Sequence, residues 1–288
     1  MMHGNQTRTI LLPDGTALPA IGQGTWNMGE KQSSQQEEVR ALRSGIELGM
    51  TVIDTAEMYA EGGAEVVTGK AIAGYRDEVF LVSKVYPHHA DRKQMITACE
   101  RSLTRLGTDR LDLYLLHWRG GVPLEETVEA LEQLKQSGKI IRWGVSNLDT
   151  RDMQELWSLP EGSQCMVNQV LYHAASRGIE HDLLPWMRER SVPVMAYCPL
   201  AQGGRLRSEL LEHPVIQKIA QDRGVTTSQI ALAWVIRDGD VLAIPKAVQL
   251  NHVADNAAAV NIVLTQEELA RLDEAFPAPK GKVPLDIV

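Results

Sequence analysis

Eight short apolar runs constrain the fold of this chain more than any other feature of its sequence. They span residues 21–24, 51–54, 79–84, 111–117, 140–146, 166–172, 192–199 and 241–246, with stretches of helical periodicity between them. Several runs are continuous in Val, Ile and Leu, which is typical of parallel strands covered on both faces. Eight strands that alternate with helices form either a closed barrel or an open doubly wound sheet.

The segment after the first run decides between these two folds. An open dinucleotide-binding sheet needs Gly-x-Gly-x-x-Gly at this point. Gly22 and Gly24 are present, but Asn27 stands where the third glycine should be. We therefore predict an α/β fold of the (β/α)8 TIM-barrel type, with residues 1–288 forming one domain. The turn Asp14-Gly15 predicts a short β-hairpin before the barrel.

Helix boundaries can be read from capping residues. The predicted N-terminal residues are Ser34 in a capping box with Glu37, Asp91, Pro123 in a first turn, Asp149, Thr227 or Ser228, and Thr265 in a capping box with Glu268. Side-chain oxygens at such positions accept hydrogen bonds from free backbone N–H groups, and proline fits the first helical turn. The predicted C-terminal glycines are Gly49, Gly107 and Gly138.

Composition excludes several classes of function. The net charge is −8, and no basic block is present. Nucleic acid and anionic membranes are therefore not expected partners, and no obligate protein partner is evident. The three cysteines are widely separated and have neither metal-site nor disulfide spacing. No secretory signal or run of about 18 apolar residues occurs, so we expect a cytoplasmic protein without a metal.

Four polar side chains lie at or beyond the ends of three successive runs. Asp54, Lys84 and His117 end the second, third and fourth runs, and Tyr59 follows Asp54 closely. In a barrel enzyme the active site lies at this end of the strands. An ammonium beside a tyrosine hydroxyl should lower the tyrosine pKa, while a carboxylate keeps the lysine charged. A histidine can donate a hydrogen bond to a carbonyl oxygen that gains negative charge.

Each of these residues also has a structural interpretation. A single Asp or His at a strand end often serves packing or hydrogen bonding, and a tyrosine in a loop usually packs. Four compatible groups at one end of a barrel favour proton delivery to a carbonyl.

At these positions the chain resembles the aldo-keto reductase superfamily. Asp54-Thr55-Ala56-x-x-Tyr59 matches the DTAxxY motif of that superfamily, and Lys84 and His117 fall where it has its catalytic Lys and His. The resemblance extends from about residue 9 to residue 276. It implies carbonyl reduction with NADPH, in which Asp54, Tyr59, Lys84 and His117 are catalytic.

The resemblance also implies a set of NADPH-binding residues. These are Gly24, Thr25, Trp26, Asp54, Ser146, Asn147, Gln169, Tyr197, Pro199, Leu200, Lys246, Ala247, His252, Asp255 and Asn256. Ser146, Asn147 and Gln169 would hold the nicotinamide carboxamide, and Tyr197 would stack on the ring. Lys246 would contact the 2′-phosphate. Taken singly, such residues are also common as helix caps or core groups.

Three positions depart from the pattern of the superfamily. Cys198 replaces a usual Ser, Ala247 replaces a Ser or Thr, and His252 replaces an Arg. Imidazole is a weaker and pH-dependent cation. We therefore expect only a modest preference for NADPH over NADH, so that NADH is also accepted.

Residues 22–26, 115–118 and 278–282 resemble a bacterial branch similar to methylglyoxal reductases, whose substrates are small reactive aldehydes. Trp26, Met58, Tyr86, His117 and Trp118 are the predicted substrate pocket. Methylglyoxal-like 2-oxoaldehydes are the expected substrates.

Two other functions remain open at the level of sequence. A strand-end lysine is also the nucleophile of Schiff-base lyases, and Lys84 could serve in that way. A charged Asp54 disfavours it, because such a lysine needs a lowered pKa. A barrel that senses the redox state of nicotinamide and docks on a partner is the other alternative.

Overall fold

The computed structural model describes residues 8–288, and a short antiparallel hairpin precedes the main sheet. Strands β1 (Thr9–Leu11) and β2 (Ala17–Pro19) pair across the turn at residues 13–15. Gly15 in this turn has φ of 84°, which glycine adopts without strain. The predicted hairpin is confirmed.

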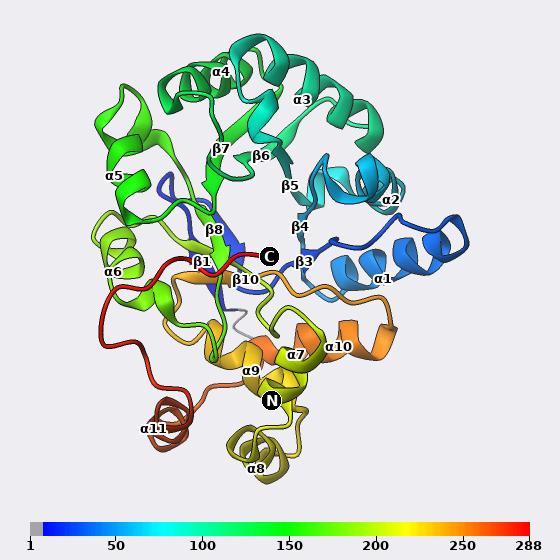
Figure 1. The fold of residues 1–288 in the computed structure, drawn as a ribbon. Coiled ribbons are helices and arrows are strands. Elements are labelled where there is room, and N and C mark those ends of the chain that lie inside the picture. The colour runs from blue at the N-terminus through cyan, green and yellow to red at the C-terminus, as the bar shows by residue number, and fades with distance from the viewer. Residues whose placement is uncertain (1–7) are drawn as a thin grey trace.

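The main sheet has eight parallel strands in sequential order. They are β3 (Gln23–Gly24), β4 (Val52–Asp54), β5 (Phe80–Val85), β6 (Leu111–Leu116), β7 (Ile140–Ser146), β8 (Asn168–Leu171), β9 (Val194–Tyr197) and β10 (Val241–Ala243). A parallel bridge between Ile21 and Ala243 joins the last strand to the segment before the first. The sheet therefore closes on itself, as Figure 1 shows, and the predicted (β/α)8 barrel is confirmed.

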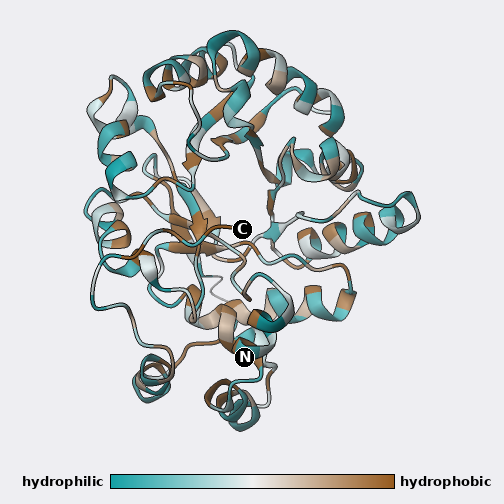
Figure 2. Cartoon of the chain, viewed as in Figure 1, coloured by the Kyte–Doolittle hydropathy of each residue, from teal (hydrophilic) through white to brown (hydrophobic). Residues whose placement is uncertain are grey.

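Helices surround the barrel. They are α1 (Gln35–Glu47), α2 (Gly63–Ile72), α3 (Arg92–Leu106), α4 (Leu124–Gln136), α5 (Thr150–Ser158), α6 (Leu183–Arg188), α7 (Gly204–Leu211), α8 (Pro214–Arg223), α9 (Thr227–Val235), α10 (Leu250–Ala258) and α11 (Gln266–Ala275). Helices α7 and α8 are additions between β9 and α9. Figure 2 shows mixed hydrophilic and hydrophobic helices around largely hydrophobic strands, as expected when each helix buries one face.

The helix ends agree with the sequence in part. Asp91, Asp149 and Thr265 cap α3, α5 and α11 as predicted. The capping box at Ser34 is wrong, because a 3₁₀ turn (Gln32–Ser34) runs directly into α1 and gives Ser34 helical angles. The cap of α9 is Thr226, which exchanges hydrogen bonds with Gln229.

Pro123 lies one residue before α4 instead of in its first turn. The prediction for these two helices was therefore off by one or two residues.

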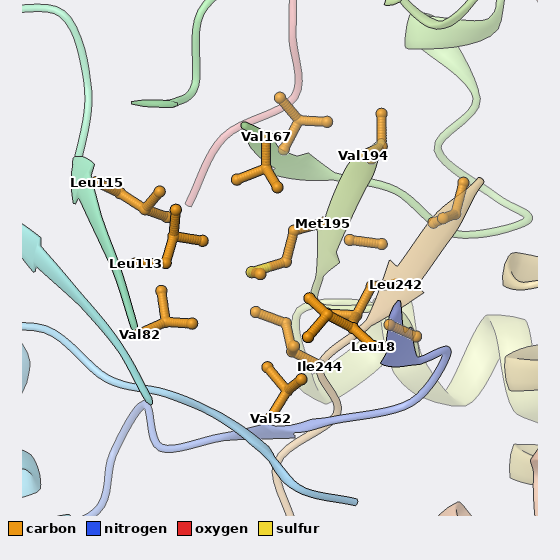
Figure 3. Packing of buried hydrophobic residues seen from close by; sticks show 14 of the residues in the cluster. Leu18, Val52, Val82, Leu113, Leu115, Val167, Val194, Met195, Leu242 and Ile244 are labelled. Carbon is orange, nitrogen blue, oxygen red and sulfur yellow. The ribbon is translucent and has the colours of Figure 1, made fainter. Parts of the chain in front are cut away.

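The barrel interior is filled by apolar side chains. Figure 3 shows residues of the barrel strands and their flanks gathered there, with Leu18 of the hairpin among them. Such packing makes the interior a core instead of a pore. None of the helices in residues 8–288 combines the length and apolar character that a membrane span needs.

Candidate active site

The four predicted catalytic side chains meet at the carboxyl ends of β4, β5 and β6. Asp54 is the last residue of β4, Lys84 lies near the end of β5, and His117 follows β6. Tyr59 begins a 3₁₀ turn (Tyr59–Gly62) whose residues Ala60 and Glu61 both have positive φ. Before this turn, the Thr55 N–H donates to Val82 O (2.9 Å), so the chain runs on beside β5.

The Lys84 ammonium is the centre of this cluster. Its Nζ donates to Asp54 Oδ2 (2.7 Å), Thr55 O (2.9 Å) and Tyr59 Oη (3.1 Å). These bonds use all three of its protons. Lys84 is fully buried and Asp54 nearly so, so the pair is held in a medium where electrostatic interactions are strong.

The pKa of Tyr59 differs from the prediction. Burial raises its pKa above the ordinary value and outweighs the opposing effect of the Lys84 ammonium. The expected net decrease is therefore wrong, because the sequence does not show how completely the phenol is buried. Burial alone would lower the pKa of Lys84, but Asp54 and Tyr59 raise it overall. The phenol is thus protonated and the ammonium charged at neutral pH.

His117 is an uncharged imidazole. Burial, followed by the nearby Lys84 ammonium, lowers its pKa to about 2. Its ring meets the Tyr59 ring edge-on with centroids 5.7 Å apart, and its Nδ1 has no hydrogen-bond partner in residues 8–288. A neutral imidazole donates through one nitrogen only, which suits polarisation of a carbonyl oxygen.

The lowered pKa of His117 predicts a loss of stability in acid. The folded pKa lies below the ordinary value of 6.5, so the unfolded chain gains a proton that the folded chain does not bind until about pH 2. The associated stability is complete above pH 6.5 and is lost as the pH falls. Between pH 6.5 and 5 we expect the wild type to lose about 1–2 kcal/mol relative to His117→Gln. Urea unfolding at the two pH values measures this, and a difference independent of pH would contradict it.

A cavity of about 320 Å³ opens beside this cluster. Among the predicted residues it is lined by Gly24, Thr25, Trp26, Asp54, Met58, Tyr59, His117, Trp118, Ser146, Asn147, Gln169, Tyr197, Pro199, Leu200 and Lys246. Contrary to the prediction, Tyr86 does not line it. Tyr86 directly precedes a 3₁₀ turn (Pro87–His89), and its ring packs edge-on against Trp118, with centroids 5.9 Å apart.

Amide and hydroxyl groups from β7, β8 and β9 also line this cavity. Gln169 Nε2 donates to Asp54 Oδ1 (2.8 Å), so both oxygens of that carboxylate accept a hydrogen bond. Ser146 Oγ donates to Gln169 O (2.8 Å), and Tyr197 Oη donates to Asn147 Oδ1 (2.8 Å). The wall therefore offers an aromatic ring beside fixed amides, a set that fits a nicotinamide ring and its carboxamide.

A second cavity of about 400 Å³ lies between α7 and α10. It is lined by Leu200, Arg207, Ser228, Lys246, Ala247, Val248, Gln249, His252, Asp255 and Asn256. Leu200, Arg207 and Lys246 line both cavities, so the two adjoin at these side chains. The predicted residues after β10 thus line one cavity that adjoins the first, which we call the catalytic cavity after the predicted role of Tyr59 and His117.

Comparisons with known proteins agree with this geometry. A model of the aldo/keto reductase family matches residues 20–276. The chain belongs to the aldo/keto reductase family. It is 59% identical over 283 residues to methylglyoxal reductase YeaE of Escherichia coli (strain K12), covering 98% of this chain and 100% of that protein. It is 32% identical over 265 residues to glyoxal reductase of Bacillus subtilis (strain 168), covering 92% and 91% of the two chains.

Solved structures give the same assignment. An aldo/keto reductase of Klebsiella pneumoniae in complex with NADP and acetate is 61% identical, with a TM-score of 0.96, covering 98% of this chain and 100% of that one. A second structure, from the same organism and in complex with NADPH, is also 61% identical with a TM-score of 0.96. That match covers 98% of this chain and 99% of the other. The predicted family is confirmed, and this aldo/keto reductase is an oxidoreductase.

Several residues that line the two cavities were not predicted. They are Asn27, Arg207, Ser228, Ile244, Val248, Gln249 and Val288. The segment after β9, residues 198–203, also lines the first cavity. Cys198 and Ala201 have φ of 48° and 64°, and Gly203 has φ of 112°. The glycine pair after β9 was the one sequence signal for this irregular segment. Burial raises the pKa of the Cys198 thiol to about 11, so it is not a reactive thiolate.

The C-terminal tail brings Val288 to the catalytic cavity. Lys282 Nζ bridges Asp149 (2.5 Å) and Asp182 (2.8 Å), and Ser176 donates to Asp286. In Figure 1 this segment runs inward past α6 and ends near the middle of the barrel.

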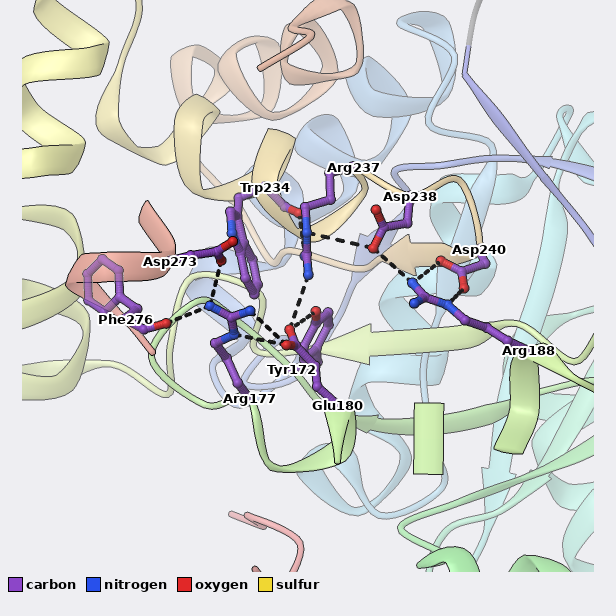
Figure 4. Close-up of polar contacts among 10 residues, drawn as sticks. All are labelled: Tyr172, Arg177, Glu180, Arg188, Trp234, Arg237, Asp238, Asp240, Asp273 and Phe276. Carbon is purple, nitrogen blue, oxygen red and sulfur yellow. Dashed lines mark hydrogen bonds and ion pairs between the residues drawn. The ribbon is translucent and has the colours of Figure 1, made fainter. Parts of the chain in front are cut away.

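The loop between β8 and α6, which contacts the tail through Ser176, is held in place by an ionic network (Figure 4). Arg177 pairs with Glu180 and Asp273, each at 2.7 Å, and joins the loop to α11. Arg237 contacts Glu180 at 3.1 Å, and its guanidinium carbon lies 3.8 Å from the centroid of the Trp234 ring. The network is partly buried, so it fixes the position of the loop more firmly than exposed pairs would.

Lys282→Ala should raise the KM for a small aldehyde about two- to five-fold with little change in kcat. The reason is that a partly exposed double ion pair stabilises the tail by about 0.5–1 kcal/mol. Lys280→Ala is the matched control, since Lys280 is exposed and forms no ion pair within residues 8–288. Steady-state kinetics of both variants test this, and equal KM values for Lys282→Ala and the wild type would contradict it.

Proposed function

We propose that this aldo/keto reductase reduces small aldehydes and ketones, chiefly methylglyoxal-like 2-oxoaldehydes, to alcohols with NADPH. The observation that supports this best is the hydrogen bond of 3.1 Å between Lys84 Nζ and Tyr59 Oη at the wall of a cavity. Bound NADPH supplies a hydride from its nicotinamide ring to the carbonyl carbon. Side chains of the protein bind and orient the substrate and deliver the proton.

Tyr59 is the proposed acid. Its side chain lines the cavity, and its raised pKa keeps the hydroxyl protonated before the reaction. As negative charge develops on the substrate oxygen, the Tyr59 proton passes to it, and the Lys84 ammonium stabilises the phenolate that remains. Asp54 keeps Lys84 charged and in place, and neutral His117 orients the carbonyl.

The two adjoining cavities support the proposed binding of NADPH. The tyrosine, amide and serine groups of β7, β8 and β9 fit the nicotinamide end. Gly24, which lines the first cavity, lets β3 pack closely against the segment after β10, since a Cβ there would meet Ile244 O at 2.7 Å. Lys246, Asp255 and Asn256 then hold the adenosine end.

The catalytic cavity also supports a small, uncharged substrate. Trp26 and Met58 are both 37% exposed and line it together with Trp118. These apolar side chains reduce the free volume next to Tyr59 and His117. A two- or three-carbon dicarbonyl fits such a site better than a sugar, and the relatives named for methylglyoxal and glyoxal are consistent with it.

The Schiff-base alternative is disfavoured by Lys84 itself. A nucleophilic amine needs a lowered pKa and access to substrate. The Lys84 pKa is raised, its three protons are engaged, and its side chain is fully buried. Borohydride should therefore trap no adduct with a carbonyl substrate.

We also propose that the enzyme acts in the cytoplasm as a single domain, without nucleic acid, membrane or an obligate protein partner. Cys99, Cys165 and Cys198 are all free thiols, which fits a reducing compartment.

Absorbance at 340 nm tests the proposed function. Pure protein mixed with NADPH and methylglyoxal should cause a steady decrease, and NADH should support a slower one. Binding of NADPH without turnover of any small aldehyde would instead favour the nicotinamide-sensing module.

A further inference from the structure

Two cations without ionic partners lie where the two cavities adjoin. Arg207 projects from α7 and Lys246 follows β10, and both line the catalytic cavity and the second cavity. Within residues 8–288 neither side chain forms an ion pair. Arg205 on the same helix, by contrast, pairs with Glu209 at 2.8 Å and lines neither cavity.

The partial burial of Arg207 makes this arrangement informative. Its side chain is neither fully exposed nor neutralised by a carboxylate. A guanidinium that is partly shielded from water and has no carboxylate beside it is free to bind an anion. Asp255 is the one carboxylate that lines the second cavity, and it forms no ion pair with either cation within the described residues.

The position of the catalytic groups fixes which end of a dinucleotide would reach each cavity. Hydride transfer requires the nicotinamide beside Tyr59 and His117, so the adenosine half must occupy the second cavity. The 2′-phosphate that distinguishes NADPH from NADH is attached to the adenosine ribose. A phosphate monoester carries a charge near −2 at neutral pH, which two cations can balance.

We infer that Arg207 binds the 2′-phosphate of NADPH together with Lys246 and so determines the preference for NADPH. This inference rests on the proposed function. Arg207 approaches from the α7 side and Lys246 from the β10 side, and a guanidinium can bind phosphate oxygens in a bidentate manner. The methyl group of Ala247 offers no hydrogen bond, and His252 offers only an imidazole. Arg207 therefore supplies a second positive charge beside that of Lys246.

Equilibrium binding, measured by calorimetry or by quenching of intrinsic tryptophan fluorescence, tests this without turnover. Arg207→Ala should raise the Kd for NADPH about ten- to thirty-fold and the Kd for NADH less than two-fold, because a charge-assisted contact is lost only with the phosphate. Lys246→Ala should show the same selectivity. Arg205→Ala is the matched control and should leave both values unchanged.

Two smaller probes locate the contact. Adenosine 2′,5′-bisphosphate contains the 2′-phosphate, and 5′-AMP does not. Arg207→Ala should weaken binding of the first probe and leave the second unchanged. Equal weakening of both, or equal weakening of NADPH and NADH, would overturn the inference and place Arg207 at a phosphate common to both cofactors. No change for either cofactor would also overturn it.

The same measurements distinguish failure of the proposed function from failure of the role inferred for Arg207. If the wild type bound neither NADPH nor NADH, the proposed function itself would be wrong. If the wild type bound and oxidised NADPH while Arg207→Ala matched it, only the role of Arg207 would be lost. Unchanged circular dichroism and melting temperature of Arg207→Ala would show that the variant is folded.

Discussion

Tyr59→Phe should lower kcat for methylglyoxal reduction by about 10²–10⁴-fold, the contribution expected of a positioned general acid. The substitution removes one oxygen and leaves the aromatic ring, so the contact with His117 at 5.7 Å can persist. Phenylalanine has no proton to give to the developing alkoxide. Stopped-flow measurement of the first turnover isolates this step from release of product.

Binding of NADPH provides the control for this variant. Tyr59 contributes no charge toward the second cavity, so the Kd for NADPH should change less than three-fold. The Lys84 ammonium loses one of its three acceptors but keeps Asp54 and Thr55 O. Near-normal turnover by Tyr59→Phe would show that another group delivers the proton.

The catalytic cluster could be predicted from the sequence because it depends on local rules. Asp54, Lys84 and His117 end successive apolar runs, and the carboxyl ends of parallel strands share one face of a barrel. The register confirms this, since Asp54 pairs with Val82 and Lys84 with Leu115. The spacing of the motif Asp54-Thr55-Ala56-x-x-Tyr59 predicted that Tyr59 lies at the same end of the barrel.

The direction of the Tyr59 pKa shift could not be predicted in the same way. The ammonium was correctly placed, but the outcome depends on how much solvent reaches the phenol. The solvent exposure of the phenol is set by segments distant in sequence, among them the segment after β9. Tyr86 shows the same limit, because its ring packs against Trp118, a residue distant in sequence.

The residues that line the two cavities were only partly predictable, for a related reason. Lys246 and Asp255 lie at recognisable places after β10. Arg207 lies on a short extra helix, and Val288 arrives at the end of a tail held by Lys282. Neither position follows from strand periodicity, because both depend on packing between segments far apart in the chain.

Lys84→Met should destabilise the fold by about 3–5 kcal/mol as well as abolish most activity. Removing one member of a buried ion pair leaves the other charge without compensation. Asp54 would keep only the Gln169 amide among its present side-chain donors, although its side chain is almost fully buried. Urea unfolding at pH 7 measures the change in the free energy of unfolding.

The double variant Asp54→Asn/Lys84→Met separates stability from catalysis. It removes both buried charges, so it should recover most of the lost stability, whereas turnover should remain as low as in the single variant because Tyr59 still lacks an ammonium. Arg92→Met is the surface control: Arg92 pairs with Glu129 at 2.5 Å, but both side chains are more than half exposed, and the expected cost is below about 1 kcal/mol. A double variant no more stable than Lys84→Met would show that lost packing, and not an uncompensated carboxylate, causes the destabilisation.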